Sequence, residues 1–534
     1  MNIQVNDFPT ALSYLKTGSP NEYEIVAQTF NELLVTNQEG EFVPLVASNL
    51  PELHETDSGV VIQYDINPLA QWDDGTSIKV EDIIFSLKTY KLPIDENIDY
   101  RTYYKRLINV IKDSKNPRRF SIVAKGNKND ILILTSDFGI LRKSKFDPNN
   151  LLRNISLSDI NNKPEEVSND ERVIQFYKQI TNHNFKFSGE FFNASGPFKI
   201  QSIDDGRRVT LVKNNKWWAD KVDGLSRKKR IPVVNYYIIP ETISAIQALK
   251  NGELDIMTRI PTHEFYTLNQ DSSFTKKFNL FSQVNFTFWF VGINSRRPFL
   301  NNKRIRKSLA HLINKEEIAK ALERGYTEST IGPVNPILKY YYNDTIKPYA
   351  YDLVTSKKLL KESNEMRNRS GGPIELDLIY KNDPRYEALA QIVKNEAEKI
   401  GVKINLAVYD SRTFNKKLLN HDFDLFIRTL TGTPYSFNFS PIFGLEAANV
   451  GGMNWTGFGN TESDSVINVI NTAPDSLVRR DGLFALQQML HDEATMLFLY
   501  FTKNNIAVNK KFTNLEISSF KPGYNIRTIE LLEQ

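Results

Sequence analysis

Alternating apolar and polar residues predict a β-strand near residue 60, and the spacing of apolar residues changes soon after it. Apolar side chains occupy every second position of residues 60–66, a period that buries one face of a strand. Residues 72–76, Trp-Asp-Asp-Gly-Thr, are typical of a tight turn. Over residues 80–87 apolar residues recur at helical spacing, and acidic residues fall in the first turn, where the helix dipole stabilises anions. The pattern predicts a strand, a turn and a helix.

A helix followed by a strand is predicted over residues 245–256. Ile246 and Leu249 supply the buried face of the helix, and Gly252 suits the left-handed conformation that ends many helices. The apolar residues from Leu254 onward begin the strand.

Two helix starts carry contrasting capping residues. Lys79 stands at the N-cap of the helix that begins at residue 80, so a capping bond of about 1 kcal/mol is expected to be missing. Asn314 and Glu317 form a pair similar to a capping box, for a helix that is expected to end near Gly325.

Residues 72–86 resemble the signature of the extracytoplasmic solute-binding proteins, family 5, which serve peptide-type ABC importers. That signature is an aromatic-x-Asp-Gly-Thr turn followed by a helix with Glu-Asp-apolar-x-Phe-Ser, and residues 81–86 match the helix. Further resemblances follow in the family's order along nearly the whole chain. They lie at residues 42–47, 196–200, 214–218, 245–256, 290–309 and 454–464.

The resemblance implies an α/β fold of the periplasmic-binding-protein-like type II class, with two large lobes joined by a hinge and a smaller inserted lobe. The expected lobes are residues 1–40, 186–280 and 496–534 for lobe I, 41–185 for the inserted lobe II, and 281–495 for lobe III. Within lobe II, the polar and proline-bearing residues 161–166 are predicted to form a surface loop. Chain crossings near 275–290 and 495–505 would make the hinge.

The resemblance also implies a function. The protein would capture a solute, expected to be a peptide, by hinge closure between lobes I and III and deliver it to the membrane permease of an ABC transporter. Two alternatives stay open, namely a ligand-binding receptor of the same fold that serves sensing, and a carrier for a non-peptide solute such as an oligosaccharide. A monomer is expected.

Composition and charge restrict the class of protein. The chain has 534 residues, more than one core usually spans, so two or more lobes are expected. The net charge of +4, from 67 basic and 63 acidic residues, is too balanced for a nucleic-acid-binding protein. The sequence has no cysteine, which excludes disulfides and zinc–thiolate sites.

The location of the protein is an expectation from the family. No run of about 18 apolar residues occurs that would encode a membrane-spanning helix. The first residues are polar and lack the apolar segment of a secretory signal, which taken alone points to the cytoplasm. The resemblance implies instead an extracytoplasmic protein, periplasmic or anchored as a lipoprotein facing outside, with its export signal upstream of residue 1.

The sequence offers no support for an enzyme. The six histidines are scattered, and no His-Glu-x-x-His, Gly-x-Ser-x-Gly, Walker or Rossmann motif is present. We therefore assign no catalytic residue, no metal ligand and no cofactor. A glycosidase-like carboxylate pair is unsupported.

Residues 423–443 are the decisive region for ligand choice. Residues 424–428 resemble the strand that leads into the family's pocket loop, typically Trp-x-x-Asp-Tyr-x-x-Pro, whose aspartate anchors the α-ammonium group of a peptide. Here no carboxylate occurs between Asp424 and Glu446. A buried ammonium needs such a partner. The departure implies an atypical or blocked peptide, a sugar or another solute, or a carboxylate elsewhere, such as Glu32, in the same role.

Six residues are the candidate ligand contacts. They are Asn31, Glu32, Arg428, Thr431, Tyr435 and Phe437. The Arg428 guanidinium suits bidentate pairing with a ligand carboxylate, and a salt bridge on the surface or between lobes is its alternative role. Tyr435 and Phe437 would supply aromatic walls or simply pack the loop, whereas Asn31 and Glu32 would offer polar contacts. Trp72 is expected in the core.

Overall fold

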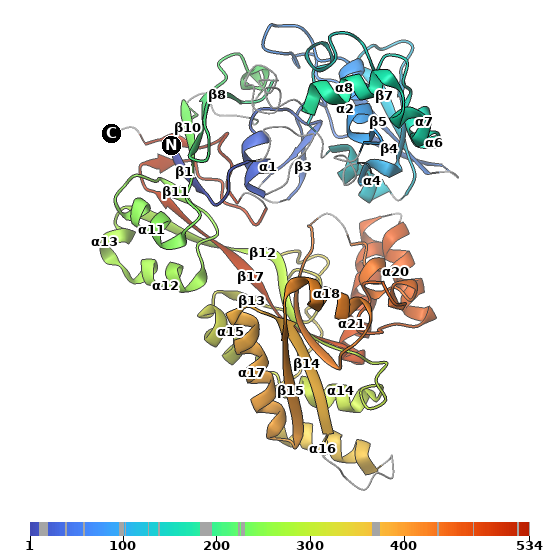
Figure 1. Cartoon of the computed structure of the whole chain (residues 1–534), viewed down its shortest axis with the longest axis vertical. Helices are drawn as coiled ribbons and strands as arrows, with labels where there is room; N and C mark the ends of the chain where they lie inside the picture. Colours follow the sequence, from blue (N-terminus) through green and yellow to red (C-terminus); the bar gives the residue numbers. More distant parts are fainter. Residues whose placement is uncertain are drawn as a thin grey trace. The chain divides into compact units, whose positions relative to one another are not determined.

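The structure is a computed structural model, shown in Figure 1. It describes residues 1–9, 20–37, 40–56, 59–94, 101, 103–126, 128–136, 139–181, 195–222, 225, 230–365, 374–434, 437–473, 475–520 and 523–532. Contacts between residues divide the chain into two compact units. Unit 1 comprises Met1–Pro261, Thr267–Gln283 and Asn504–Gln534, and unit 2 comprises Thr262–Tyr266 and Val284–Lys503. The boundaries of the three expected lobes remain a prediction.

Two large β-sheets lie in the described part of unit 1. The first has the strand order β17-β11-β1-β10-β9-β8, with β17 spanning Met496–Asn509, and β1 is parallel to β10 and to β11. Its bounds are β1 Asn2–Val5, β8 Phe198–Asp204, β9 Arg208–Lys213, β10 Val233–Ile238 and β11 Ile256–Met257. The second sheet is antiparallel, with the order β4-β5-β7-β6. Its bounds are β4 Glu52–Thr56, β5 Gly59–Asp65, β6 Leu107–Lys112 and β7 Arg119–Ala124.

Short ribbons and helices complete unit 1. The ribbons pair β2 Leu34–Thr36 with β3 Phe42–Pro44, and β18 Phe512–Thr513 with β19 Glu530–Leu531. The α-helices are α1 Pro20–Val26, α2 Val80–Lys91, α4 Lys128–Ser136, α5 Lys143–Phe146, α6 Leu157–Asn162, α7 Pro164–Ser168, α8 Glu171–Thr181, α11 Thr242–Lys250 and α13 Ser272–Thr275. The 3₁₀-helices are η2 Tyr104–Arg106 and η3 Trp218–Lys221. Helix α12, Thr262–Gln270, begins in unit 2 and ends in unit 1.

The predicted strand, turn and helix over residues 60–87 are confirmed. Side chains of β5 alternate between buried and half-buried, as the period of two requires. The turn is closed by the Trp72 N–H, which donates to the Thr76 carbonyl at 2.8 Å, and Gly75 has a φ of 84°. Trp72 is 2% exposed and belongs to the core, as expected.

The start of α2 is capped by a residue inside the helix. The Lys79 side chain makes no capping bond, as expected. The Asp82 carboxylate instead accepts the backbone N–H groups of Lys79 and of Lys143, each at 3.0 Å. Burial raises the pKa of Asp82. This carboxylate therefore ties α2 to α5 as well as closing the first turn.

Two further local predictions are confirmed. Gly252 follows α11 with a φ of 79°, and β11 begins soon after it. The Asn314 side chain accepts the Glu317 N–H at 3.2 Å at the start of α15, Lys315–Glu323, and Gly325, with a φ of 81°, follows that helix.

The prediction of a surface loop at residues 161–166 is wrong. These residues lie in α6 and α7, which are joined at Lys163. Ser156 and Asp159 form a capping box at the start of α6, and Pro164 occupies the first position of α7, where its missing N–H costs nothing. The polar residues are the outward faces of two short helices.

Unit 2 contains a β-sheet with both parallel and antiparallel strand pairs, together with several helices. The strand order is β15-β14-β16-β12-β17, and β13 pairs with β17. Strand β14 is parallel to β15 and β16, whereas β12 is antiparallel to β16. The strands are β12 Phe278–Ile293, β13 Thr327–Ser329, β14 Ile374–Lys381, β15 Val402–Tyr409, β16 Leu425–Thr431 and β17 Met496–Asn509. The helices are α14 Lys303–Ala310, α15 Lys315–Glu323, α16 Leu353–Glu365, α17 Pro384–Glu398, α18 Ser411–Leu419, α19 Ser440–Phe443, η4 Glu446–Ala448, α20 Thr461–Thr472 and α21 Ser476–Glu493.

Strands β12 and β17 belong to both units. The division between the units falls at Gln283 and Val284 in β12, and at Lys503 and Asn504 in β17. Within unit 2, alternate residues of β12 enter two apolar clusters: Trp289, Val291 and Ile293 enter one, and Phe288 and Phe290 enter the other. Both faces of this sheet are therefore covered. No helix in the described ranges is both long and apolar enough to cross a membrane.

A buried carboxyl group in unit 1 is set among tyrosines. Glu24 of α1 lies with its carboxyl fully buried and accepts a hydrogen bond from the Tyr524 hydroxyl. The Arg259 guanidinium lies 3.7 Å from its other oxygen. Burial dominates, and it raises the pKa of Glu24 from 4.5 to about 7.

Glu24 gives unit 1 a pH-dependent stability. Because its pKa in the folded state exceeds the ordinary value, its contribution is complete below pH 4.5 and is lost as the pH rises through about 7. Between pH 4.5 and 8 the free energy of unfolding should fall by on the order of 3 kcal/mol more for the wild type than for Glu24→Gln. Denaturant unfolding at several pH values measures this difference, and parallel pH profiles would contradict it.

Strands β12 and β16 approach each other closely at one glycine. Gly292 pairs with Phe426, and the Phe426 ring lies against the Gly292 Cα. A Cβ atom built on Gly292 would meet a ring carbon of Phe426 at 2.1 Å. Only glycine therefore fits at this point of the sheet.

Gly292→Ala should lower the free energy of unfolding by about 2 kcal/mol or more, because the aromatic ring must leave its packed position. Gly432→Ala is the matched control, since its Cβ would meet nothing closer than the Phe286 carbonyl at 3.9 Å. Thermal unfolding of both variants measures the two stabilities. Equal stabilities of Gly292→Ala and Gly432→Ala would contradict the close contact between Gly292 and the Phe426 ring.

Candidate ligand-binding site

The side chain of Arg428 stacks on aromatic rings in unit 2. It projects from β16, where Arg428 pairs with Phe290 of β12. The guanidinium carbon lies 4.5 Å from the centre of the Trp455 ring and 5.8 Å from that of Phe414. Nη1 donates to the Asn415 side-chain oxygen at 2.8 Å. Helix α18 and the segment before α20 thus hold this side chain from two sides.

The charge of Arg428 has no counterion among the described residues. The side chain is half-buried, its Nε atom is buried without an acceptor, and no described carboxylate forms an ion pair with it. Burial lowers the pKa of the guanidinium. Burial also lowers the pKa of Lys381, and the charge of Arg428 lowers it further. The salt bridge considered as an alternative role for Arg428 is not seen within the described ranges.

This arrangement can hold an anion. Removing a cation from water without a counterion costs free energy, which a bound carboxylate would recover. Stacking on Trp455 and Phe414 fixes the plane of the guanidinium, and a fixed plane favours bidentate hydrogen bonds to a carboxylate. Neither Trp455 nor Phe414 is among the six residues that the sequence predicts as ligand contacts. The signal for Trp455 was its place in the segment 454–464.

The other candidates in unit 2 lie at or beyond the end of β16. Thr431 is exposed, and its hydroxyl lies 2.8 Å from that of Thr287. Phe437 is half-buried and packs on Tyr341, with ring centres 4.9 Å apart. Tyr435 lies outside the described residues. Ligand contact by these three residues remains a prediction.

Asn31 and Glu32 lie in unit 1. Asn31 is fully buried, and its amide group donates to the carbonyl and the hydroxyl of Ser195 at 2.8 and 2.6 Å. Its side-chain oxygen accepts the Trp217 indole N–H at 3.0 Å. Glu32 is half-buried, and its carbonyl accepts the Val46 N–H at 3.1 Å. The amide of Asn31 thus joins three segments, and its contact with a ligand remains a prediction, as does that of Glu32.

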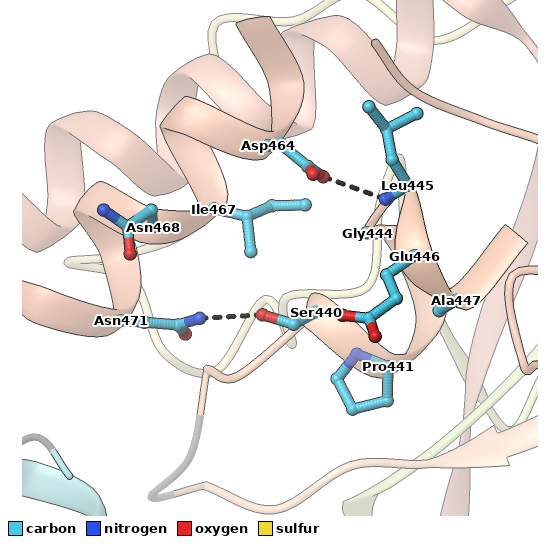
Figure 2. Close-up of a pocket in the computed structure, with 10 residues that line it drawn as sticks. All are labelled: Ser440, Pro441, Gly444, Leu445, Glu446, Ala447, Asp464, Ile467, Asn468 and Asn471. Carbon is cyan, nitrogen blue, oxygen red and sulfur yellow. Dashed lines mark hydrogen bonds between the residues drawn. The ribbon is translucent and has the colours of Figure 1, made fainter. Parts of the chain in front are cut away.

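A pocket of about 500 Å³ lies in unit 2, directly after the predicted ligand loop (Figure 2). It lies between α20 and the segment of α19 and η4. Its lining residues are Ser440, Pro441, Gly444, Leu445, Glu446, Ala447, Asp464, Ile467, Asn468 and Asn471. None of these was a candidate, because the pocket needs two segments whose contact the sequence pattern does not reveal.

Two hydrogen bonds hold the pocket walls together. Asp464 accepts the Leu445 N–H at 2.9 Å, and the Asn471 amide donates to the Ser440 hydroxyl at 2.8 Å (Figure 2). A third contact links the pocket to the Arg428 site. The buried Asn454, which precedes Trp455, donates to the Gly444 carbonyl at 3.1 Å.

Comparison with known proteins finds relatives that match nearly the whole chain. The chain is 24% identical to the oligopeptide-binding protein OppA of Bacillus subtilis, over 94% of this chain and 87% of OppA. It is 19% identical to the oligopeptide-binding protein AppA of the same organism, over 98% of this chain and 89% of AppA.

Solved structures agree in fold. The AppA structure from Bacillus subtilis in complex with a nonapeptide has a TM-score of 0.66 at 18% identity, covering 100% of this chain and 99% of that chain. The unliganded open form of MppA, a periplasmic murein tripeptide-binding protein, has a TM-score of 0.79 at 15% identity, covering 100% and 97%. The predicted α/β fold of the type II periplasmic-binding-protein class is confirmed.

The family model of the bacterial extracellular solute-binding proteins, family 5, matches residues 41–448, which is more than half of the chain. The chain therefore belongs to the bacterial extracellular solute-binding proteins of family 5.

Proposed function

We propose that this protein is the non-catalytic, extracytoplasmic component of an ABC importer and that its solute is a peptide. Membership in the family supports the transport role, and the two oligopeptide-binding relatives support the peptide. Capture by hinge closure, delivery to a membrane permease, a monomeric state and a lipid anchor are parts of the same proposal.

The observation that carries the proposal is the uncompensated charge of Arg428. A free peptide always ends in a carboxylate, and acidic side chains add more. The guanidinium stacked on Trp455 and Phe414 offers such a group a partner in a partly desolvated setting. Thr431, Tyr435 and Phe437 follow on the same chain segment, and we assign them to the ligand as well. Asn31 and Glu32 are the proposed contributions of unit 1.

The bound solute can be identified directly. Native mass spectrometry of the purified protein, followed by denaturation, should release a mixture of short peptides. Release of a sugar or another non-peptide solute would contradict the proposed peptide ligand. The role as a solute-binding protein would still stand. Recovery of intact ligand after long incubation is expected from a non-catalytic protein, whereas turnover would establish a hydrolase.

Arg428→Ala should weaken binding of a peptide with a free carboxyl terminus by at least about tenfold, or about 1.4 kcal/mol, because the ligand carboxylate loses its partner. Trialanine is a suitable probe, and isothermal titration calorimetry is the measurement. Arg428→Lys should give an intermediate affinity, because it keeps the charge and loses the planar stacking.

Arg412→Ala is the matched control. Arg412 lies on α18, the helix that carries Phe414, and its side chain is exposed. Trialanine affinity should be unchanged in this variant. Equal affinities of wild type and a folded Arg428→Ala would remove Arg428 from the site.

A further inference from the structure

A second cation lies beside Arg428, on the neighbouring strand of unit 2. Strands β14 and β16 are parallel, and Ile379 pairs with Phe426. Lys381 and Arg428 each lie two residues beyond that pair, so their side chains leave the sheet on the same face. Because neighbouring strands lie about 4.8 Å apart, the two cations start from adjacent positions near the ends of their strands.

Both cations contact the ring of Phe414. The Lys381 Nζ atom lies 5.9 Å from the centre of this ring, and the guanidinium carbon of Arg428 lies 5.8 Å from it. The Trp455 ring covers the guanidinium as well. Each of these contacts is a cation–π interaction, which stabilises a cation but does not neutralise it. One aromatic ring thus brings two positive charges together.

Neither charge is neutralised by a described residue. No described carboxylate forms an ion pair with Lys381 or Arg428. Lys381 is half-buried, and its ammonium group makes no hydrogen bond with a described residue. The Nε atom of Arg428 is buried without an acceptor. Burial lowers the pKa of Lys381, and the charge of Arg428 lowers it further, so the two cations are close enough to repel each other.

The acidic residues of the adjoining segments have other partners. Asp410 accepts two backbone N–H groups at the start of α18. Asp422 pairs with Lys417 at 2.7 Å. Asp424 lies 3.3 Å from Nε of Arg297. Two adjacent cations that are partly removed from water without a counterion cost free energy, which a bound anion would recover.

The two cations differ in the anion that each one suits. Stacking fixes the plane of the Arg428 guanidinium, and a fixed plane favours two parallel hydrogen bonds to one carboxylate. The Lys381 ammonium is a point charge on a flexible stem, which suits a second anion beside the first. A ligand with one carboxylate would leave the other cation without a counterion. The arrangement therefore favours two carboxylates over one.

We propose that Arg428 and Lys381 together bind a group with two neighbouring carboxylates, as in the carboxy-terminal Asp or Glu of a peptide or in a free dicarboxylate. The peptide source rests on the proposed function, whereas the free dicarboxylate does not. In the peptide, the α-carboxylate pairs with Arg428 and the side-chain carboxylate pairs with Lys381. Lys381 is then the residue that determines a preference for an acidic last residue.

The test compares three probes on the full chain by isothermal titration calorimetry. Ala-Ala-Glu and Ala-Ala-Gln have nearly the same shape and differ by one carboxylate. Glutarate has the two carboxylates of glutamate and no peptide bond. The wild type should bind Ala-Ala-Glu at least about tenfold more tightly than Ala-Ala-Gln, because only the first peptide neutralises both cations. This comparison needs no variant, so it can refute the proposal by itself.

Three variants locate the effect. Lys381→Met keeps an unbranched side chain without the charge, and it should remove the preference for Ala-Ala-Glu and abolish glutarate binding. Both peptides on both proteins form a double-mutant cycle, which isolates the coupling between Lys381 and the second carboxylate. Lys381→Arg should keep the preference, because it keeps the charge.

Lys416→Met is the matched control. Lys416 is an exposed lysine of α18, the helix that carries Phe414. The preference for Ala-Ala-Glu and the binding of glutarate should be unchanged in this variant. Circular dichroism verifies that each variant folds.

The outcomes separate this proposal from the proposed function. If both peptides bind the wild type equally, or if the preference persists in Lys381→Met, the dicarboxylate proposal is refuted and peptide transport stands. If neither peptide binds but glutarate binds the wild type and not Lys381→Met, the site stands for a free dicarboxylate and the peptide proposal fails. If no probe binds the wild type, both are refuted.

Discussion

The pairing of β12 with β16 is the constraint on which the site depends. A strand alternates its side chains between two faces, so the register decides which face Arg428 occupies. Pairing Phe290 with Arg428 places the guanidinium beside Trp455 and Phe414. A slip of one residue would turn it toward the cluster of Trp289 and Val291. Gly292 holds the register, because only its missing side chain admits the Phe426 ring.

One buried amide connects the Arg428 site with the pocket beside α20. Asn454 precedes the Trp455 ring that stacks on Arg428, and its side-chain amide donates to the carbonyl of Gly444, which lines that pocket. No carboxylate occurs in the chain between Asp424 and Glu446, and Glu446, the first one after that interval, lines this pocket.

The pattern of apolar and polar residues predicted those elements of the fold whose conformation depends on residues close by in the sequence. The strand at residue 60, the Gly75 turn and the left-handed Gly252 follow from side-chain period and backbone preference. The loop predicted at residues 161–166 failed because the polar residues there are the outer faces of short capped helices. The surroundings of Arg428 required Trp455 and Phe414, which are distant in sequence, and Asn31 is joined to residues more than 160 positions away. No local period encodes such contacts.

The strand order of unit 1 bears on how the newly made chain folds. Strand β1 at the start of the chain lies between β10 and β11, and β11 pairs with β17, near the end. During synthesis more than 200 further residues must be made before β1 can pair with β10. This sheet is complete only when residue 508 has been made. Strands β14, β15 and β16 of unit 2 are consecutive in sequence, so their pairing closes shorter loops and forms faster. We therefore infer that the β14-β15-β16 part of unit 2 forms its strand pairs before the amino-terminal sheet is complete.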